Sequence, residues 1–175
     1  MQFEATEIAG LVAVKLTRHA DERGSFARLF CRDEFAAHGL ADVFVQASLS
    51  VTRRAGTLRG MHFQRPPHAE VKLVRCVRGA IFDVIADLRR DSPTYLRWQG
   101  FELSPGSDVA LCIPEGCAHG FLTLTDDCEV LYQMSVPYAP DFADGVRYDD
   151  PALGIVWPHA AVLVAEKDLA WPPIA

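Results

Sequence analysis

Alternating hydrophobic and polar residues dominate the middle of the chain. Residues 72–78 (KLVRCVR) and 80–88 (AIFDVIADL) both alternate, and they flank a glycine. This pattern predicts two strands joined as a hairpin that turns at Arg78-Gly79. The same alternation predicts further strands at residues 44–50, 60–64, 98–103, 109–113, 120–125 and 130–136. Many short strands separated by Gly, Pro, Ser and Asp turns indicate an all-β sandwich or barrel.

Two regions depart from the strand pattern. Residues 32–38 favour one short helix, and Gly39 stands where helices commonly end in a left-handed residue. The last fifth of the chain is rich in proline and less regular, so we expect it to wrap around the barrel. No internal repeat, low-complexity tract or linker interrupts the chain, which predicts a single domain spanning residues 1–175.

Some charged residues occupy strand positions that would point into the barrel. In the strand expected at 60–64, alternation places His62 and Gln64 on one face and Met61 on the other. In the next two strands, Lys72 and Asp83 each lie on a face that also carries apolar residues. Both faces of these strands are partly apolar, as expected when one lines a barrel and the other packs on a second layer or subunit. Buried charges are costly unless they are paired or functional. The pattern therefore marks these residues as candidates for a site.

The charge balance indicates which class of partner the protein binds. The net charge of −6 argues against a nucleic-acid partner, because such affinity depends on clustered Lys and Arg. Arginines still gather at positions 53, 54 and 59 and again at 75 and 78. In an acidic chain this favours a small anion such as a phosphate, and the alternative is a solvated strand face.

The cysteines and the apolar segments indicate the cellular compartment in which we expect the protein. The five cysteines are scattered, odd in number and contain no CxxC pair, so we expect reduced thiols that mostly fill the core. The first residues lack the basic and apolar regions of a signal peptide. No apolar run approaches the roughly 20 residues that cross a bilayer. We expect a cytoplasmic soluble protein without a membrane partner.

One turn motif is typical of cupin-type barrels. Residues 114–119 (PEGCAH) contain the PxGxxH turn that opens a strand in such barrels. Metal-binding cupins add a His-x-His pair and a glutamate, but the earlier strand here reads His62-Phe63-Gln64. Two histidines seldom hold a catalytic metal, which usually needs three protein ligands. We therefore expect a site without a metal or other cofactor.

Several longer motifs resemble those of one particular protein family. Residues 56–95 (GTLRGMHFQRPPHAEVKLVRCVRGAIFDVIADLRRDSPTY), 113–124 (IPEGCAHGFLTL) and 131–140 (LYQMSVPYAP) resemble the dTDP-4-dehydrorhamnose 3,5-epimerase family. The likeness extends from residues 20–26 (ADERGSF) through DDPALGIVWP to the EKD at 166–168. The resemblance implies a cupin-like jelly-roll barrel with short peripheral helices and an isomerase of deoxysugar biosynthesis.

The resemblance also implies a reaction and its catalytic residues. The family inverts C3, C5 or both in a nucleotide-linked 4-keto-6-deoxyhexose by removing a proton next to the ketone and returning it to the opposite face. His62 stands at the position of the general base, and Asp168 matches the carboxylate that orients it. Lys72 matches the residue that stabilises the enolate oxygen, and Tyr132 the acid that returns the proton.

Further positions are implied to bind the sugar nucleotide, which is the expected small-molecule partner. Arg59 and Arg23 would serve the diphosphate, and His119 would lie near the reacting sugar. Phe26 and Tyr138 would pack near the ligand. The family also implies a homodimer with strands exchanged between barrels, so that Arg23 would serve the neighbouring subunit's site.

Three departures from the family concern the nucleotide base. Arg28 stands where the family usually has an acidic residue, and Gln46-Ala47-Ser48 replaces the usual Gln-x-Asn. Ala143, with Asp144 beside it, replaces a glutamate. The implied catalytic residues are intact, whereas the implied base-recognition residues are altered.

Other functions are compatible with the same residues. The same chemistry could act on a sugar linked to a different nucleotide, and the same residues serve single and double epimerases. A ketoisomerase on a related barrel is a second enzyme hypothesis, which Tyr132 and Asp168 argue against. A sugar-nucleotide binding module without catalysis is the alternative from a different class.

Overall fold

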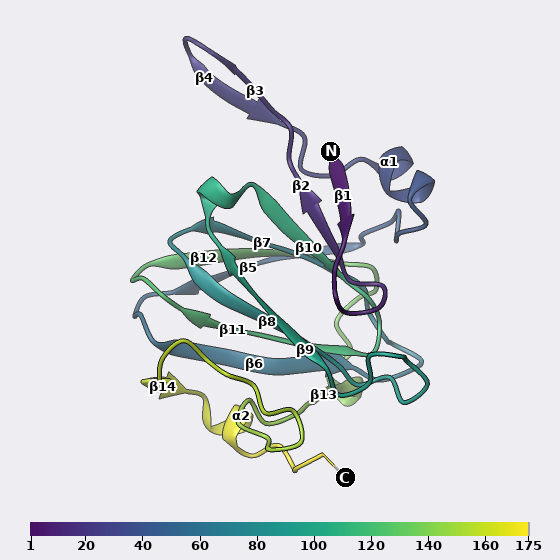
Figure 1. The fold of residues 1–175 in the computed structure, drawn as a ribbon, viewed down its shortest axis with the longest axis vertical. Helices are drawn as coiled ribbons and strands as arrows, with labels where there is room; N and C mark the ends of the chain where they lie inside the picture. Colours follow the sequence, from purple (N-terminus) through teal and green to yellow (C-terminus); the bar gives the residue numbers. More distant parts are fainter. Residues whose placement is uncertain (175) are drawn as a thin grey trace.

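Two sheets face each other in the structure, a computed structural model that describes residues 1–174 (Figure 1). The first sheet has the strand order β1 (Gln2–Ala5), β2 (Val12–Lys15), β10 (Val109–Ile113), β7 (Lys72–Arg78), β12 (Cys128–Met134) and β5 (Gln46–Thr52). The second has the order β13 (Ala143–Gly145), β6 (Thr57–Gln64), β11 (Cys117–Thr123), β8 (Ile81–Asp87) and β9 (Trp98–Leu103), and β14 (Leu163–Val164) runs parallel to β6. All other pairs are antiparallel, which confirms the predicted all-β jelly-roll barrel.

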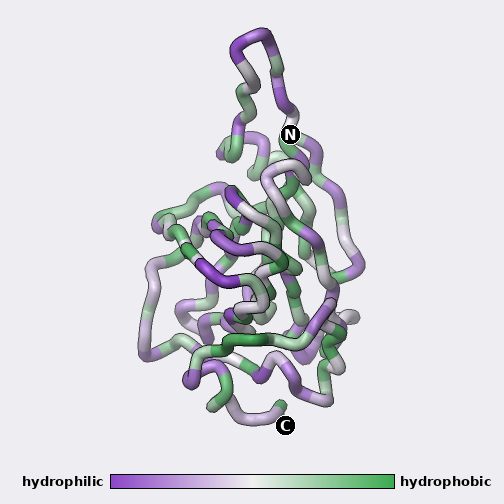
Figure 2. The backbone as a smooth tube through the Cα atoms, turned by 90° about the vertical axis from the view of Figure 1, so that its left-hand side faces the viewer, coloured by the Kyte–Doolittle hydropathy of each residue, from purple (hydrophilic) through white to green (hydrophobic). Residues whose placement is uncertain are grey.

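The remaining elements lie outside the two sheets. The hairpin of β3 (Arg18–Asp21) and β4 (Gly24–Ala27) projects from one end of the molecule (Figure 1), and its tip is hydrophilic (Figure 2). Helix α1 (Arg32–Ala37) ends before Gly39 at φ +68°, as predicted, and helix α2 (Glu166–Leu169) lies near the C-terminus. Short 3-10 turns occupy Pro105–Ser107 and Pro140–Phe142. Among residues 1–174 neither helix has the length or apolar character needed to span a membrane.

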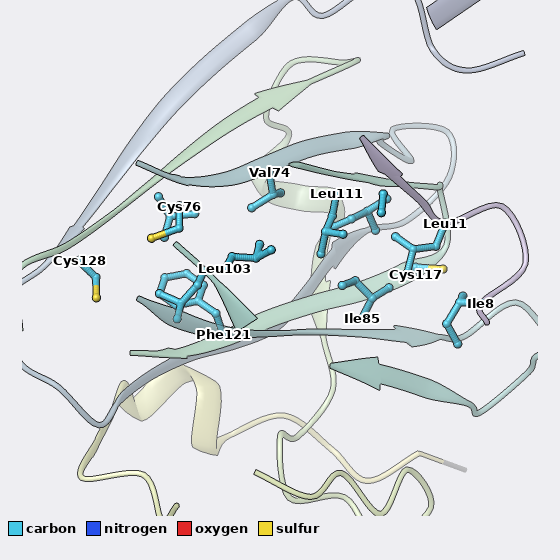
Figure 3. Packing of buried hydrophobic residues seen from close by; sticks show 14 residues of the cluster. Ile8, Leu11, Val74, Cys76, Ile85, Leu103, Leu111, Cys117, Phe121 and Cys128 are labelled. Carbon is cyan, nitrogen blue, oxygen red and sulfur yellow. The ribbon is translucent and has the colours of Figure 1, made fainter. Parts of the chain in front are cut away.

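The main core fills the space between the sheets. Val74, Leu111 and Leu103 meet Ile85 and Phe121 there, all of them almost completely buried (Figure 3). A second cluster lies on the outer face of the second sheet, where Met61, Val84 and Ala118 pack against Trp157 and other residues of the C-terminal segment. The last part of the chain therefore wraps around the barrel, as predicted. Because this segment covers the outer face of the second sheet, strands β8 and β11 carry apolar residues on both faces.

The predicted hairpin at Arg78-Gly79 is wrong. Strands β7 and β8 follow each other in sequence, but β7 pairs with β10 and β12 whereas β8 pairs with β9 and β11. Gly79, at φ +75°, lies at a corner where the chain crosses from one sheet to the other. A Cβ at this position would lie 2.7 Å from the Sγ of Cys128. A glycine between two alternating segments is therefore required at this corner, just as it would be in a tight hairpin.

Candidate functional site

A cleft with two adjoining lobes lies in the barrel. Their volumes are about 470 Å³ and about 590 Å³, and His62, Lys72, Tyr132 and Lys167 line both of them. We call the smaller one the first lobe, which also contains Arg59 and His119, and the larger one the second lobe. A cleft of this size is typical of small-molecule sites.

Residues from both sheets contribute to the cleft. Strand β6 of the second sheet supplies Arg59 and His62, and its neighbour β11 supplies His119 opposite His62 in the pairing register. The facing first sheet supplies Lys72 from β7 and Tyr132 from β12. Alternation turns Lys72, Tyr132 and His119 toward the interior. Arg59 and His62 are three positions apart, and they share the cleft because the register between β6 and β11 shifts between them.

His62 is held by a buried carboxylate. Its Nε2 lies 2.7 Å from Oδ1 of Asp168, a residue of α2 that is only 1 % exposed. The other carboxylate oxygen accepts a hydrogen bond from the Gly60 amide at 3.3 Å. Burial alone would raise the pKa of Asp168, but the hydrogen bond and charge of His62 together with the Gly60 amide leave the pKa below its usual value.

This carboxylate determines the state of the imidazole. An ionised Asp168 can only accept, so Nε2 of His62 carries the proton that it donates. In the neutral ring Nδ1 is then unprotonated and can act as a base. Because the side chain of His62 remains 34 % exposed, it is accessible from the cleft.

His119 forms a second histidine–carboxylate pair that the sequence analysis missed. Its Nε2 lies 2.8 Å from Oδ1 of Asp83, and both side chains are buried. The alternation of β8 placed Asp83 inward, but it could not identify the partner on β11. The second carboxylate oxygen of Asp83 is buried and has no hydrogen-bond partner among the described residues.

Lys72 is held at the junction of the two lobes. Its Nζ donates a hydrogen bond to the backbone carbonyl of His62 at 3.0 Å and lies 3.0 Å from Oε1 of Glu70. The side chains of Lys72 and Glu70 are 12 % and 8 % exposed. Lys72 was expected in the site from the sequence, whereas no sequence motif pointed to Glu70.

Tyr132 lies across the first lobe from the strand that carries His62. Its ring is roughly perpendicular to that of His119, with centroids 5.8 Å apart. Burial, and then the negative charge of Asp83, raise the pKa of Tyr132, while Arg59 lowers it by less. The phenol therefore keeps its proton at neutral pH and can donate it.

Arg59 lies at the rim of the first lobe. Its guanidinium donates hydrogen bonds to the Thr52 hydroxyl at 3.0 Å and to the Val51 carbonyl at 3.4 Å, and no carboxylate neutralises it in either contact. Arg75 and Arg78 do not share this site, contrary to the clustering seen in the sequence. Arg75 lies on the outer face of the first sheet and donates to the Leu29 carbonyl, and burial lowers its pKa to about 10.

The second lobe has the aromatic and amide groups that sequence analysis placed near the ligand. Gln46, Ser48 and Tyr138 line it, and the Gln46 side chain accepts a hydrogen bond from the Tyr138 amide at 3.0 Å. Ala143 also lines this lobe. Asp144 beside it pairs with Arg65 at 3.0 Å, so its charge is already matched.

Three of the expected binding residues do not reach the cleft of their own chain. Arg23 and Phe26 lie on the projecting β3–β4 hairpin, where Arg23 pairs with Asp21 and Phe26 is 73 % exposed (Figure 1). Arg28 follows this hairpin and forms an ion pair with Glu34 of α1 at 2.8 Å. Within one chain the structure therefore does not bring them to the other site residues.

The described part of the chain offers no obvious set of metal ligands. Among residues 1–174 no three His, Cys, Asp or Glu side chains converge as a metal would require. Gln64 stands where metal-binding cupins have their second histidine. Its amide donates to the His68 carbonyl and accepts from the Ala139 amide, so it organises the loop beside the cleft.

Known proteins share both the sequence and the fold. The family model described as dTDP-4-dehydrorhamnose 3,5-epimerase matches residues 5–175. Two relatives of that name come from Sinorhizobium fredii, 42 % identical over 99 % of this chain and 90 % of that protein, and Methanothermobacter thermautotrophicus, 43 % identical over 99 % and 94 %. A dTDP-4-dehydrorhamnose 3-epimerase of Streptomyces niveus is 40 % identical over 96 % of this chain and 81 % of that protein.

Two solved structures of similar proteins contain nucleotides. The dTDP-4-dehydrorhamnose 3,5-epimerase of Bacillus anthracis, with TDP and PPi bound, has a TM-score of 0.95 and 36 % identity and covers 99 % of each chain. A dTDP-6-deoxy-D-glucose-3,5-epimerase of Legionella pneumophila, in complex with dTDP-4-keto-L-rhamnose, has a TM-score of 0.91 and 34 % identity over 97 % of this chain and 90 % of that one.

Proposed function

The chain belongs to the dTDP-4-dehydrorhamnose 3,5-epimerase family, and we propose on that basis that its cleft inverts C3, C5 or both in a dTDP-linked 4-keto-6-deoxyhexose. The observation that carries this proposal is the His62–Asp168 pair at 2.7 Å, in a cleft that Lys72 and Tyr132 also line. We further propose that residues 1–175 act as one epimerase domain, since both sheets supply residues to this cleft.

Proton removal is assigned to His62. A carbon next to a ketone is a weak acid, so the reaction needs a base with a free lone pair close to the C–H bond. Asp168 keeps the proton on Nε2 and leaves Nδ1 free to accept one. When the ring becomes an imidazolium, the same buried carboxylate stabilises the new positive charge.

The enolate and the returning proton are assigned to the other residues of the first lobe. The ammonium of Lys72 would stabilise negative charge on the C4 oxygen, and His119 would lie near the reacting sugar. Tyr132 comes from the sheet that faces His62, and its raised pKa keeps the phenol protonated. An acid and a base on opposing sheets suit a reaction in which the proton leaves one face of the sugar ring and returns to the other.

Nucleotide binding is assigned to the rim and the second lobe. Arg59 has a guanidinium available for the diphosphate, and the ring of Tyr138 offers a stacking surface for the base. Gln46 and Ser48 would supply hydrogen bonds to the base or the ribose.

We also propose a homodimer in which the β3–β4 hairpin of one protomer completes the cleft of its partner. Arg23 and Phe26 lie on this hairpin, which projects from the barrel (Figure 1), and neither lines the cleft of its own chain. The outer face of the first sheet is apolar and uncovered at its β5 edge, where Leu49 and Val51 are each 53 % exposed. Such a face favours association with a second copy of the chain.

Hydrogen exchange in D₂O tests the proposed reaction. We expect incubation with dTDP-4-keto-6-deoxyglucose to place deuterium at C3, C5 or both, as followed by NMR, because both base and acid exchange their protons with solvent. His62→Ala should lower kcat by on the order of 10²–10⁴, since this is the usual contribution of an oriented general base. Product without deuterium, or near-normal turnover of His62→Ala, would remove this mechanism.

A further inference from the structure

A buried carboxylate beside the proposed enolate-binding lysine has no assigned role. Glu70 lies two residues before Lys72, just outside β7, and its Oε1 is 3.0 Å from Nζ of Lys72. Other ion pairs, such as Lys15–Glu4, are formed by side chains that are nearly half exposed. The Glu70–Lys72 pair is almost closed to solvent, and Glu70 also lines the second lobe.

The ammonium of Lys72 has two partners in the cleft. Its Nζ donates a hydrogen bond to the carbonyl of His62 and forms an ion pair with Oε1 of Glu70, both at 3.0 Å. A lysine ammonium sits on a flexible four-carbon stem, so a single contact would leave it free to swing. A hydrogen bond and an ion pair together restrict the nitrogen, and the three donors of an ammonium still leave capacity for a ligand in the cleft.

The two anchors also place the ammonium relative to the base. The carbonyl belongs to His62 itself, so Nζ is tied to the backbone of the residue that carries the imidazole. Glu70, which lines the second lobe together with Lys72, supplies the second contact. Enolate stabilisation requires a donor that is aligned before the charge develops, and small misplacements cost much of the rate.

We propose that Glu70 is a positioning residue that holds Lys72 and orients its ammonium toward the ketone oxygen of the sugar. The proposal rests on the proposed function, because it assumes that Lys72 stabilises the enolate. It predicts an effect on the chemical step and little effect on nucleotide binding.

Four variants and a double variant test this role. Steady-state kinetics with the dTDP-linked 4-keto sugar would compare Glu70→Ala, Glu70→Gln, Lys72→Met and the double variant Glu70→Ala/Lys72→Met. Glu4→Ala is the matched control, because it removes the carboxylate of an exposed lysine pair. Thermal melting of each variant checks that the fold is retained.

The expected result is a loss in kcat that depends on Lys72. Glu70→Ala should lower kcat about tenfold with KM within about twofold, and Glu70→Gln should stay within about threefold of the wild type, because its amide oxygen can occupy the same position beside the ammonium. Lys72→Met should lower kcat by roughly 10²–10³. The double variant should be no slower than Lys72→Met, and Glu4→Ala should match the wild type.

Other outcomes overturn the proposal in distinguishable ways. If Lys72→Met keeps its activity, the proposed role of Lys72 fails and the role of Glu70 fails with it. If Lys72→Met is slow but Glu70→Ala is normal, only the positioning role fails. A raised KM with unchanged kcat in Glu70→Ala would make Glu70 a ligand contact, and additive losses in the double variant would make it a structural residue.

Discussion

The cleft contains two histidines, and each has a carboxylate at the same ring nitrogen. Asp168 lies at Nε2 of His62 and Asp83 lies at Nε2 of His119. The two pairs differ in access, because His62 is about one-third exposed whereas His119 and Asp83 are buried. This difference suits His62 for proton exchange with solvent and His119 for a fixed contact with the sugar.

The first prediction is that activity does not depend on a metal. The Nε2 atoms of both histidines are engaged by carboxylates, and Gln64 is hydrogen-bonded to backbone, so three free ligands do not converge in the described part of the cleft. Turnover should stay within about twofold after exhaustive treatment with EDTA. Loss of activity that a divalent ion restores would contradict this prediction.

The second prediction concerns the nucleotide base. Ser48 is short, Ala143 has no polar group, and Asp144 beside it is already paired with Arg65. A site with few matched hydrogen bonds discriminates weakly between bases. Calorimetry with dTDP, UDP, CDP and GDP should therefore give dissociation constants within roughly tenfold of one another, with affinity carried mainly by the diphosphate. A preference for dTDP of several orders of magnitude would show that these residues do not relax base selection.

Among the secondary-structure elements, the end of β8 depends on one buried carboxylate. Asp87 accepts hydrogen bonds from Arg89, Ser92 and Thr94, and thereby organises the loop that leads toward β9. Burial by itself would raise the pKa of Asp87, but these hydrogen bonds outweigh it and lower the pKa to about 2. The folded state thus favours the ionised carboxylate, and this preference is a contribution to stability.

The third prediction is a pH-dependent loss of stability in Asp87→Asn. The folded pKa lies below the ordinary value of 3.8, so the contribution is complete above about pH 4 and is lost as the pH falls toward 2. Urea unfolding at pH 7 should give a free energy of unfolding lower by about 2 kcal/mol, and the difference should shrink on acidification. Asp42→Asn, which removes an exposed partner of Arg32, should change it by less than about 1 kcal/mol. An equal loss at every pH would contradict the assigned cause.

At the scale of the whole molecule, no residue of the β3–β4 hairpin lines the cleft of its own chain. Strand β5 is an edge strand of the first sheet, and its outward residues Leu49 and Val51 continue the apolar surface that a second copy could cover. Arg23 and Phe26 belong to the β3–β4 hairpin, which projects beyond the sheets (Figure 1), and neither lines the cleft of its own chain. A complete site therefore requires two chains in the proposed arrangement.

The fourth prediction is that two inactive variants restore activity when mixed. Arg23→Ala and His62→Ala should each be slow as homodimers. After unfolding and refolding together, mixed dimers should contain one intact cleft, formed by His62 of one protomer and Arg23 of the other. Roughly one quarter of wild-type activity should return, and light scattering should give the mass of a dimer. A monomeric mass, or no recovery from well-folded mixed dimers, would contradict the arrangement.

Much of the fold could be predicted from the sequence because strand position depends on local alternation. The strands at 72–78, 98–103 and 109–113 match the structure to the residue. Others, such as β5 and β11, are shifted by two or three residues. The β3–β4 hairpin and α2 were not predicted, because both are short and lack a clear hydrophobic period. Helix α2 is four residues long and takes its place from the contact of Asp168 with His62.

The sequence by itself determined which residues point inward, and its motifs indicated the family and the reacting groups. Those properties depend on side-chain period and residue identity, which are local. Only the tertiary structure decided which inward groups meet. It separated β7 from β8, paired His119 with Asp83, joined Glu70 to Lys72, and placed Arg23 away from its own cleft. His119 and Asp83 lie on strands that are distant in the chain, and the packing of strands around one interior brings them together. Glu70 and Lys72 are two residues apart, and they meet because both side chains turn into the second lobe.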